Sequence, residues 1–158
     1  MKVILPGSYD PITLGHLDII RRAREKYDEV FVVAFINPDK KYCFSERERL
    51  DMLRLATHGF DNVTVDFFCG RVVDYMKEKG IDKIVKGYRN EADLNYERIQ
   101  QQYNFSHGGY ETELIICSEE YSEISSTAAR DAIFSGGDLS KILPKEVIKY
   151  INDKKTSI

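Results

Sequence analysis

Residues 6–16 read Pro-Gly-Ser-Tyr-Asp-Pro-Ile-Thr-Leu-Gly-His, and they follow the short apolar run Val3-Ile4-Leu5. A helical pattern begins directly afterwards, so we expect a strand to pass through a turn rich in Gly and Pro into a helix N-terminus. Free backbone N–H groups and the positive end of the helix dipole favour phosphate binding at such a position. The stretch also supplies the hydroxyls of Ser8 and Thr13 and places His16 at the helix mouth. These groups can hold a nucleoside triphosphate and stabilise charge that develops on it.

Beyond this stretch, apolar runs alternate with segments of helical periodicity. The runs are β-branched and mostly unalternated, which is typical of parallel strands buried on both faces. We expect strands at 2–5, 30–36, 63–68, 83–85 and 113–117, and helices at 15–27, 46–58, 71–79 and 91–105, after Ser125 or Ser126, and after Pro144. The order predicts an α/β fold with a doubly wound, parallel, five-stranded sheet of Rossmann-like type. We expect one domain over residues 1–158.

Composition and charge narrow the class of protein. The chain has 158 residues, 42% of them hydrophobic, and a net charge of −3. This charge argues against extended binding to nucleic acid, and the absence of a long apolar run argues against a membrane-bound protein. The N-terminus enters a strand directly, so no signal peptide is expected. The cysteines Cys43, Cys69 and Cys117 are far apart, so we predict neither a disulfide nor a protein metal site.

Three further polar groups follow predicted strands. In a doubly wound sheet, ligands bind beyond the carboxyl ends of the strands, so these groups are expected to meet the first loop there. Taken singly each has a simpler explanation, since lysine pairs are usually solvated and Ser-Ser-Thr before a helix is usually an N-cap. Together they favour one anion-binding pocket. The groups are Asn37–Lys41, Lys86–Arg89 and Tyr121–Thr127.

The tetrad Thr13-Leu14-Gly15-His16 resembles the signature of the nucleotidyltransferase superfamily. The longer stretch 6–16 resembles one branch of it, the bacterial phosphopantetheine adenylyltransferases. Segment 86–97 is similar to the Arg-Gly-Leu-Arg…Ala-Asp-Phe-Glu-Tyr-Glu segment of that branch, and segment 121–127 is similar to its Ile-Ser-Ser-Ser loop. The similarity extends over nearly the whole chain and implies the Rossmann-like nucleotidyltransferase fold.

The resemblance implies a reaction. Enzymes of this branch transfer AMP from ATP to 4′-phosphopantetheine and release dephospho-coenzyme A and pyrophosphate, a step of coenzyme A synthesis. It further implies Mg²⁺ as cofactor, a cytoplasmic location and a homohexamer. A nicotinamide mononucleotide adenylyltransferase, or another small-molecule nucleotidyltransferase, remains the alternative enzyme. A non-catalytic nucleotide sensor of the same fold is the alternative from another class.

The resemblance also implies site residues. His16 and Lys40 would be catalytic, with His16 on the ATP phosphates. Ser8 would contact both substrates, and Asn104 would lie near the pantetheine arm. The ATP site would comprise Ser8, Tyr9, His16, Gly87, Tyr88, Arg89, Glu97, Tyr121, Ser122, Glu123, Ile124, Ser125, Ser126 and Thr127, and the acceptor site Ser8, Lys40, Val72, Lys86 and Asn104.

Three positions depart from the pattern of the branch. Lys86 replaces the usual arginine and so offers a point charge in place of a bidentate fork. Arg71 stands where an apolar residue of the pantetheine wall is common. Ser-Ser-Thr followed by Arg130 is closer to the Ile-Ser-Ser-Thr-x-x-Arg loop of related nucleotidyltransferases. These departures concern affinity and identity of the acceptor, while the predicted reaction type is unaffected.

Overall fold

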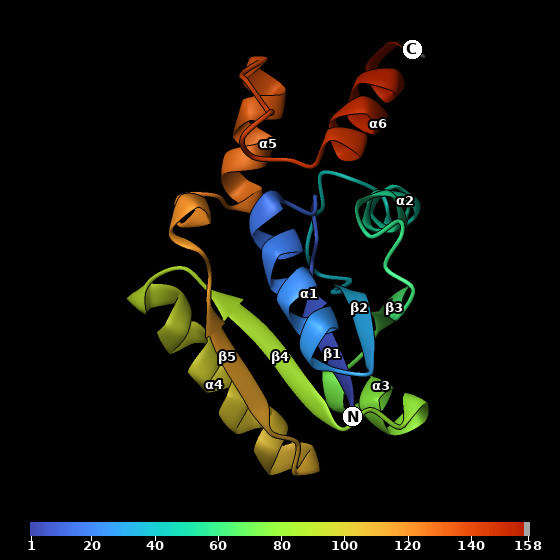
Figure 1. Ribbon diagram of the computed structural model, residues 1–158, viewed down its shortest axis with the longest axis vertical. Helices are drawn as coiled ribbons and strands as arrows, with labels where there is room; N and C mark the ends of the chain where they lie inside the picture. The colour runs from blue at the N-terminus through green and yellow to red at the C-terminus, as the bar shows by residue number, and fades with distance from the viewer. Residues whose placement is uncertain (157–158) are drawn as a thin grey trace.

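The computed structural model describes residues 1–156 and contains one parallel sheet (Figure 1). The strand order is β3-β2-β1-β4-β5, so strands are added on both sides of β1 and the winding direction reverses there. This confirms the expected doubly wound, five-stranded, Rossmann-like α/β sheet. The strands are β1 (Lys2–Gly7), β2 (Glu29–Ile36), β3 (Val63–Cys69), β4 (Lys83–Tyr88) and β5 (Thr112–Ile116).

Helices follow the strands as expected, with ends set by local chemistry. Ser45 and Glu48 form a reciprocal capping box at the start of the second helix, and Gly80 ends the third in the left-handed conformation at φ 67°. Such caps satisfy terminal N–H and C=O groups. The helices are α1 (Leu14–Lys26), α2 (Glu46–Ala56), α3 (Val72–Lys79), α4 (Glu91–Gly108), the 3-10 turn η1 (Glu119–Tyr121), α5 (Ser126–Ser135) and α6 (Lys145–Thr156).

Two clusters of buried apolar side chains join the helices to the sheet. The larger cluster joins α1, α2, α5 and α6 to the sheet and includes Ile20 and Leu53. The smaller cluster packs Tyr75 and Met76 of α3 against the sheet. Figure 1 shows α1 crossing in front of the strands and α4 running beside β5. Within α4 the buried residue is Asn104, so this helix contributes little to the core.

Two strands extend further than the sequence predicts. β1 continues to Gly7 and β4 to Tyr88, so the expectation that Lys86–Tyr88 form a loop after the strand was wrong. Gly87 pairs with Ile115 of β5, and this pairing overrides the weak strand preference of glycine. A Cβ atom at Gly87 would lie 2.6 Å from a side-chain carbon of Ile19. The glycine therefore allows α1 to approach the sheet closely beside the site.

The prediction that the strands are buried on both faces does not hold for all of them. The edge strand β3 consists of partly buried and exposed residues, with Phe67 43% exposed, and β5 ends at the exposed Ile116. Edge strands lack a neighbour on one side, so their faces are covered less completely. Among the described helices, none combines the length and apolarity required to cross a bilayer.

Candidate active site

The loop that leaves β1 is held by Tyr9. This residue has φ +48°, a conformation that L side chains rarely adopt, and it is almost fully buried. Its hydroxyl donates to the backbone carbonyl of Leu5 over 2.9 Å, and its ring fills the space beside Gly7, where a Cβ atom would lie 3.2 Å from it. Backbone strain of this kind persists where the surroundings impose it. Ser8 in this loop lines both cavities described below.

His16 belongs to the capping box that begins α1. The backbone N–H of His16 donates to Thr13 Oγ1, and Nδ1 of His16 accepts from the backbone N–H of Thr13 over 3.0 Å. A backbone amide is only a donor, so Nδ1 must be unprotonated. The proton of the neutral ring therefore lies on Nε2, which leaves a free N–H donor in the site.

The charge state of this ring is set by its surroundings. Burial first, and then the charges of Lys86 and Arg89, lower the pKa of His16 to about 4. The ring is therefore neutral at pH 7. The ring of Tyr9 contacts it edge-on, with 4.9 Å between centroids. His16 is thus a neutral hydrogen-bond donor of fixed orientation.

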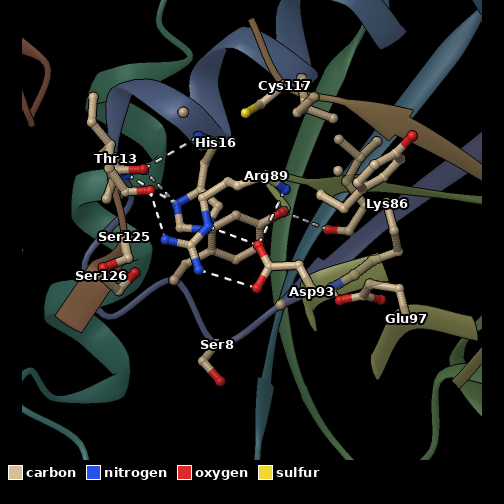
Figure 2. Close-up of a pocket in the computed structure, with 18 of the residues that line it drawn as sticks. Ser8, Thr13, His16, Lys86, Arg89, Asp93, Glu97, Cys117, Ser125 and Ser126 are labelled. Carbon is tan, nitrogen blue, oxygen red and sulfur yellow. Dashed lines mark hydrogen bonds and ion pairs between the residues drawn. The ribbon is translucent and has the colours of Figure 1, made fainter. Parts of the chain in front are cut away.

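Four cations line the same cavity, and Figure 2 shows two of them, Lys86 and Arg89. Lys40 Nζ lies 3.5 Å from Ser8 Oγ. Lys86 Nζ donates to the Pro6 carbonyl over 2.9 Å and lies 3.4 Å from a Glu97 carboxylate oxygen. These contacts direct two ammonium groups toward the end of β1. The other two cations are Arg89 and Arg130.

Each arginine is fixed by its own partners. Arg89 donates to both carboxylate oxygens of Asp93, over 2.8 and 3.1 Å. Arg130 donates to the backbone carbonyl of Asp10 over 2.9 Å and to the hydroxyl of Thr127 over 3.2 Å. Planar guanidinium groups held in this way are preorganised to bind phosphate oxygens.

The N-terminus of α5 closes the cavity. Ser125 caps the helix by accepting from the N–H of Ala128, and the hydroxyl of Ser126 donates to the carbonyl of Pro11. Ser125, Ser126 and Thr127 line the cavity. An anion placed there meets backbone N–H groups and the positive end of the helix dipole.

Two cavities adjoin at the carboxyl end of the sheet. The larger, of about 520 Å³, contains His16 and the four cations. The smaller, of about 300 Å³, is lined by apolar residues such as Val72 and by polar ones such as Asn104. Their common wall is formed by Pro6, Gly7, Ser8, Lys86, Tyr96 and Glu97. The site can therefore hold two ligands whose reacting ends meet at this wall.

The structure places most of the predicted site residues in these cavities, while their roles remain predictions. The larger cavity contains Ser8, Tyr9, His16, Lys40, Lys86, Gly87, Tyr88, Arg89, Glu97, Ile124, Ser125, Ser126 and Thr127. The smaller contains Val72 and Asn104. Tyr121, Ser122 and Glu123 do not line either cavity, and neither does Lys41. The loop turns through η1 at this point, so its first residues lie outside the hollow.

Sequence reasoning missed contributions from other residues. Asp93 was not among the predicted site residues, yet it fixes Arg89, and its spacing of four from Arg89 could have indicated the pair. Arg130 was noted only as a departure from the branch, although it faces the cavity. Thr112, whose Oγ1 is buried without a hydrogen-bond partner, lines the smaller cavity. Its sequence context, a short edge strand, gave no signal.

Comparison with known proteins identifies the family of the chain. Residues 4–132 match the family model described as cytidylyltransferase-like. The chain is 43% identical to the phosphopantetheine adenylyltransferase of Corynebacterium diphtheriae, over 99% of both chains. It is 41% identical to the protein of that name from Corynebacterium glutamicum, over 98% of this chain and 97% of the relative. It is 40% identical to the one from Streptomyces coelicolor, over 97% and 96%.

Proposed function

The chain belongs to the cytidylyltransferase-like family and, within it, to the phosphopantetheine adenylyltransferases, and on this premise we propose that it transfers AMP from ATP to 4′-phosphopantetheine. The products are dephospho-coenzyme A and pyrophosphate, so the reaction is a step of coenzyme A synthesis. One observation carries the proposal. Two cavities, one cationic and one partly apolar, share the wall of Ser8, Lys86 and Glu97.

The smaller cavity suits the acceptor. Val72 and Phe35 supply an apolar surface for the methyl groups and methylenes of the arm, and Asn104 supplies a buried amide that can pair with its amide groups. Lys86 stands at the shared wall, with Lys40 beyond it in the larger cavity. The two ammonium groups would hold the terminal phosphate of the acceptor at the point where the cavities meet.

The reaction requires no general base. The acceptor is a phosphate monoester, already anionic at pH 7 because its second pKa is about 6. Its oxygen attacks the α-phosphorus of ATP in line with the departing pyrophosphate, and no covalent enzyme intermediate is formed. Positioning two anions and neutralising their charge therefore provides most of the catalysis.

Different residues of the larger cavity position the substrates and neutralise their charge. The Nε2–H of His16 donates to the α-phosphate as charge increases there in the transition state. Lys40 neutralises the attacking phosphate and forms, with His16, the catalytic pair. Arg89, together with the N-terminus of α5, holds the β- and γ-phosphates that leave as pyrophosphate. Gly87 and Tyr88 present the end of β4 to the nucleotide.

Magnesium is proposed as an ion that enters with the nucleotide. The described residues contain no group of three or more His, Cys, Asp or Glu side chains placed to hold a metal. The three carboxylates of this cavity are already engaged, Asp93 by Arg89, Glu97 by Lys86, and Asp10 by the backbone N–H groups of Cys43 and Phe44. Mg²⁺ commonly binds through phosphate oxygens and water, with few protein ligands. When bound, it neutralises charge on the triphosphate.

We also infer a cytoplasmic homohexamer, with no nucleic-acid or membrane partner. The inference rests on membership of the family, on the net charge of −3, and on exposed apolar side chains such as Ile99 and Phe105 on α4. Exposed apolar patches are common at subunit interfaces. Light scattering coupled to gel filtration measures the assembly directly, and a monomer at micromolar concentration would contradict it.

Acceptor choice tests the proposed function. Pyrophosphate release from ATP is measured with 4′-phosphopantetheine and, in parallel, with nicotinamide mononucleotide. We expect turnover with the first and little with the second, because the smaller cavity is lined by side-chain amides and has Phe35 as its aromatic ring apart from Tyr96 at the wall. Equal or reversed turnover would reject the assignment. Nucleotide binding without turnover on either acceptor would instead indicate a sensor.

A further inference from the structure

Lys86 and Glu97 form an ion pair at the wall between the two cavities. Lys86 Nζ lies 3.4 Å from a Glu97 carboxylate oxygen, and the side chains are 25% and 12% exposed. Both residues line both cavities. Figure 2 shows the amine of Lys86 beside the carboxylate of Glu97, away from His16. The ammonium that is proposed to hold the acceptor phosphate is therefore already neutralising a carboxylate.

The environment of Glu97 makes its negative charge depend on that ammonium. Burial raises the pKa of Glu97, and the charge of Lys86 opposes this rise. Two other titratable groups interact electrostatically with the carboxylate, Asp93 from the same helix and Tyr9 from the loop after β1. Neither supplies a positive charge, and Asp93 is itself held by Arg89. Lys86 is thus the cation that stabilises ionised Glu97.

Binding of the acceptor changes this balance. If the proposed function is correct, a phosphate dianion comes to lie between Lys40 and Lys86, so it must share the Lys86 ammonium with the Glu97 carboxylate. The carbonyl of Pro6 already occupies a further N–H of that group. Two negative groups sharing one site favour protonation of one of them, because their repulsion in a buried site is strong. Glu97 is already desolvated, so its negative charge is less stable than that of the phosphate.

We propose that Glu97 takes up one proton from solvent when the acceptor phosphate engages Lys86. The proton binds a carboxylate oxygen, and no covalent bond of the acceptor is made or broken in this step. The resulting carboxylic acid can donate a hydrogen bond to a phosphate oxygen, so Lys86 is released to the acceptor and the repulsion becomes an attraction. The proton returns to solvent when the acceptor site empties.

Linkage makes this step measurable. A ligand whose binding takes up a proton binds more weakly as pH rises, by at most about tenfold per pH unit for one proton. Phosphate itself has the opposite effect. Contact with a cation favours the dianion of a phosphate monoester, whose second pKa is about 6, so phosphate binding alone releases a fraction of a proton. Net proton uptake on binding therefore indicates protonation of Glu97, whereas net proton release indicates ionisation of the phosphate alone.

The test is isothermal titration calorimetry of the full-length protein with 4′-phosphopantetheine, at about pH 6 and about pH 7. At each pH it is run in several non-phosphate buffers that differ in ionisation enthalpy, and the slope of the observed heat against that enthalpy gives the number of protons taken up. The variant is Glu97→Gln, which keeps the shape and removes the titration. The matched control is Glu91→Gln, at the exposed first turn of the same helix.

We expect wild type and Glu91→Gln to take up more protons than Glu97→Gln, with a difference approaching one proton at the lower pH. We also expect the acceptor affinity of wild type to fall with rising pH more steeply than that of Glu97→Gln. Measurable binding with equal proton counts in all three proteins would overturn the inference. If Glu97→Gln does not fold, net proton release by wild type at both pH values would overturn it. Absence of binding to 4′-phosphopantetheine would instead reject the proposed function.

Discussion

The backbone N–H of Thr13 donates to Nδ1 of His16, so the residue that caps α1 also determines which ring nitrogen carries the proton. The donor is part of the main chain and cannot rotate or ionise, unlike a side chain. The Nε2–H that is left faces the larger cavity, and burial together with Lys86 and Arg89 keeps the ring neutral. A donor prepared in this way needs no reorganisation when charge develops on a phosphate.

Removal of His16 separates chemistry from binding. His16→Ala should lower turnover by about 10²–10³-fold, or about 2.7–4 kcal/mol, because a donor that acts in the transition state is lost. The Michaelis constants for ATP and for the acceptor should change much less. Turnover and melting temperature are measured on one preparation. A folded variant with near-normal turnover would mean that His16 serves only as a cap.

The lowered pKa of His16 also affects stability. The unfolded imidazole takes up its proton near pH 6.5 and the folded one near pH 4, so between these values the unfolded state binds more protons. The free energy of unfolding should therefore fall as pH falls through this window, by at most about 1.4 kcal/mol per pH unit from this group. His16→Asn should show a shallower slope in urea unfolding at several pH values. An identical slope in both proteins would contradict the burial of a neutral ring.

Lys86 is expected to act on the acceptor. Lys86→Ala should raise the Michaelis constant for 4′-phosphopantetheine while that for ATP changes little, because Lys86 stands at the wall facing the smaller cavity. Lys86→Arg should be tolerated, since it keeps a cation within reach of Pro6 and Glu97. Steady-state kinetics with each substrate varied in turn measures both. Unchanged acceptor dependence in Lys86→Ala would remove this residue from the site.

Asp93 is a positioning residue for Arg89. Asp93→Asn should raise the Michaelis constant for ATP several-fold, because a bidentate partner that fixes the guanidinium is weakened. The matched control is Asp74→Asn, which weakens the similar Arg71–Asp74 pair outside both cavities. Kinetics of both variants decides the matter. The same effect in both, or none in Asp93→Asn, would show that Arg89 needs no such partner.

Gly87 is expected to matter for packing as well as for binding. A side chain there must displace Ile19, so Gly87→Ala should lower the free energy of unfolding by about 1–3 kcal/mol, as overpacking does. Gly137→Ala is the control, because its Cβ atom would make ordinary contacts of 3.6 Å with Ala132. Urea unfolding of the two variants compares them. Equal stability would show that α1 moves away from the sheet without cost.

Periodicity and caps predicted most of the fold. The alternation of apolar runs and helical segments predicted the five strands in order. The start of α2 and the end of α3 lie at the expected residues, where Ser45 and Gly80 cap them. Hydrophobic periodicity and helix caps depend on residues close together in the chain, so they can be recognised from the sequence. The continuation of β4 through Gly87 could not be predicted, because it depends on pairing with β5, which lies far along the chain.

The sequence predicted some residues of the candidate site and missed others. Positions within the motifs, such as His16 and Arg89, were identified because the motifs themselves mark them. Asp93 and Arg130 were not, because their importance lies in which side chains the fold brings beside them. The same is true of the Lys86–Glu97 pair. Segment 86–97 contains both residues, yet their contact depends on how α4 packs against β4.

The shared wall of the two cavities has a consequence for inhibition. A compound that occupies both cavities must pass Ser8, Lys86 and Glu97, and linking its two halves there makes the second binding event intramolecular. The same three residues line the point where the two proposed substrates meet. Under the proposed function, a mutation that repels such a compound at the wall therefore also disturbs the point where the two substrates react.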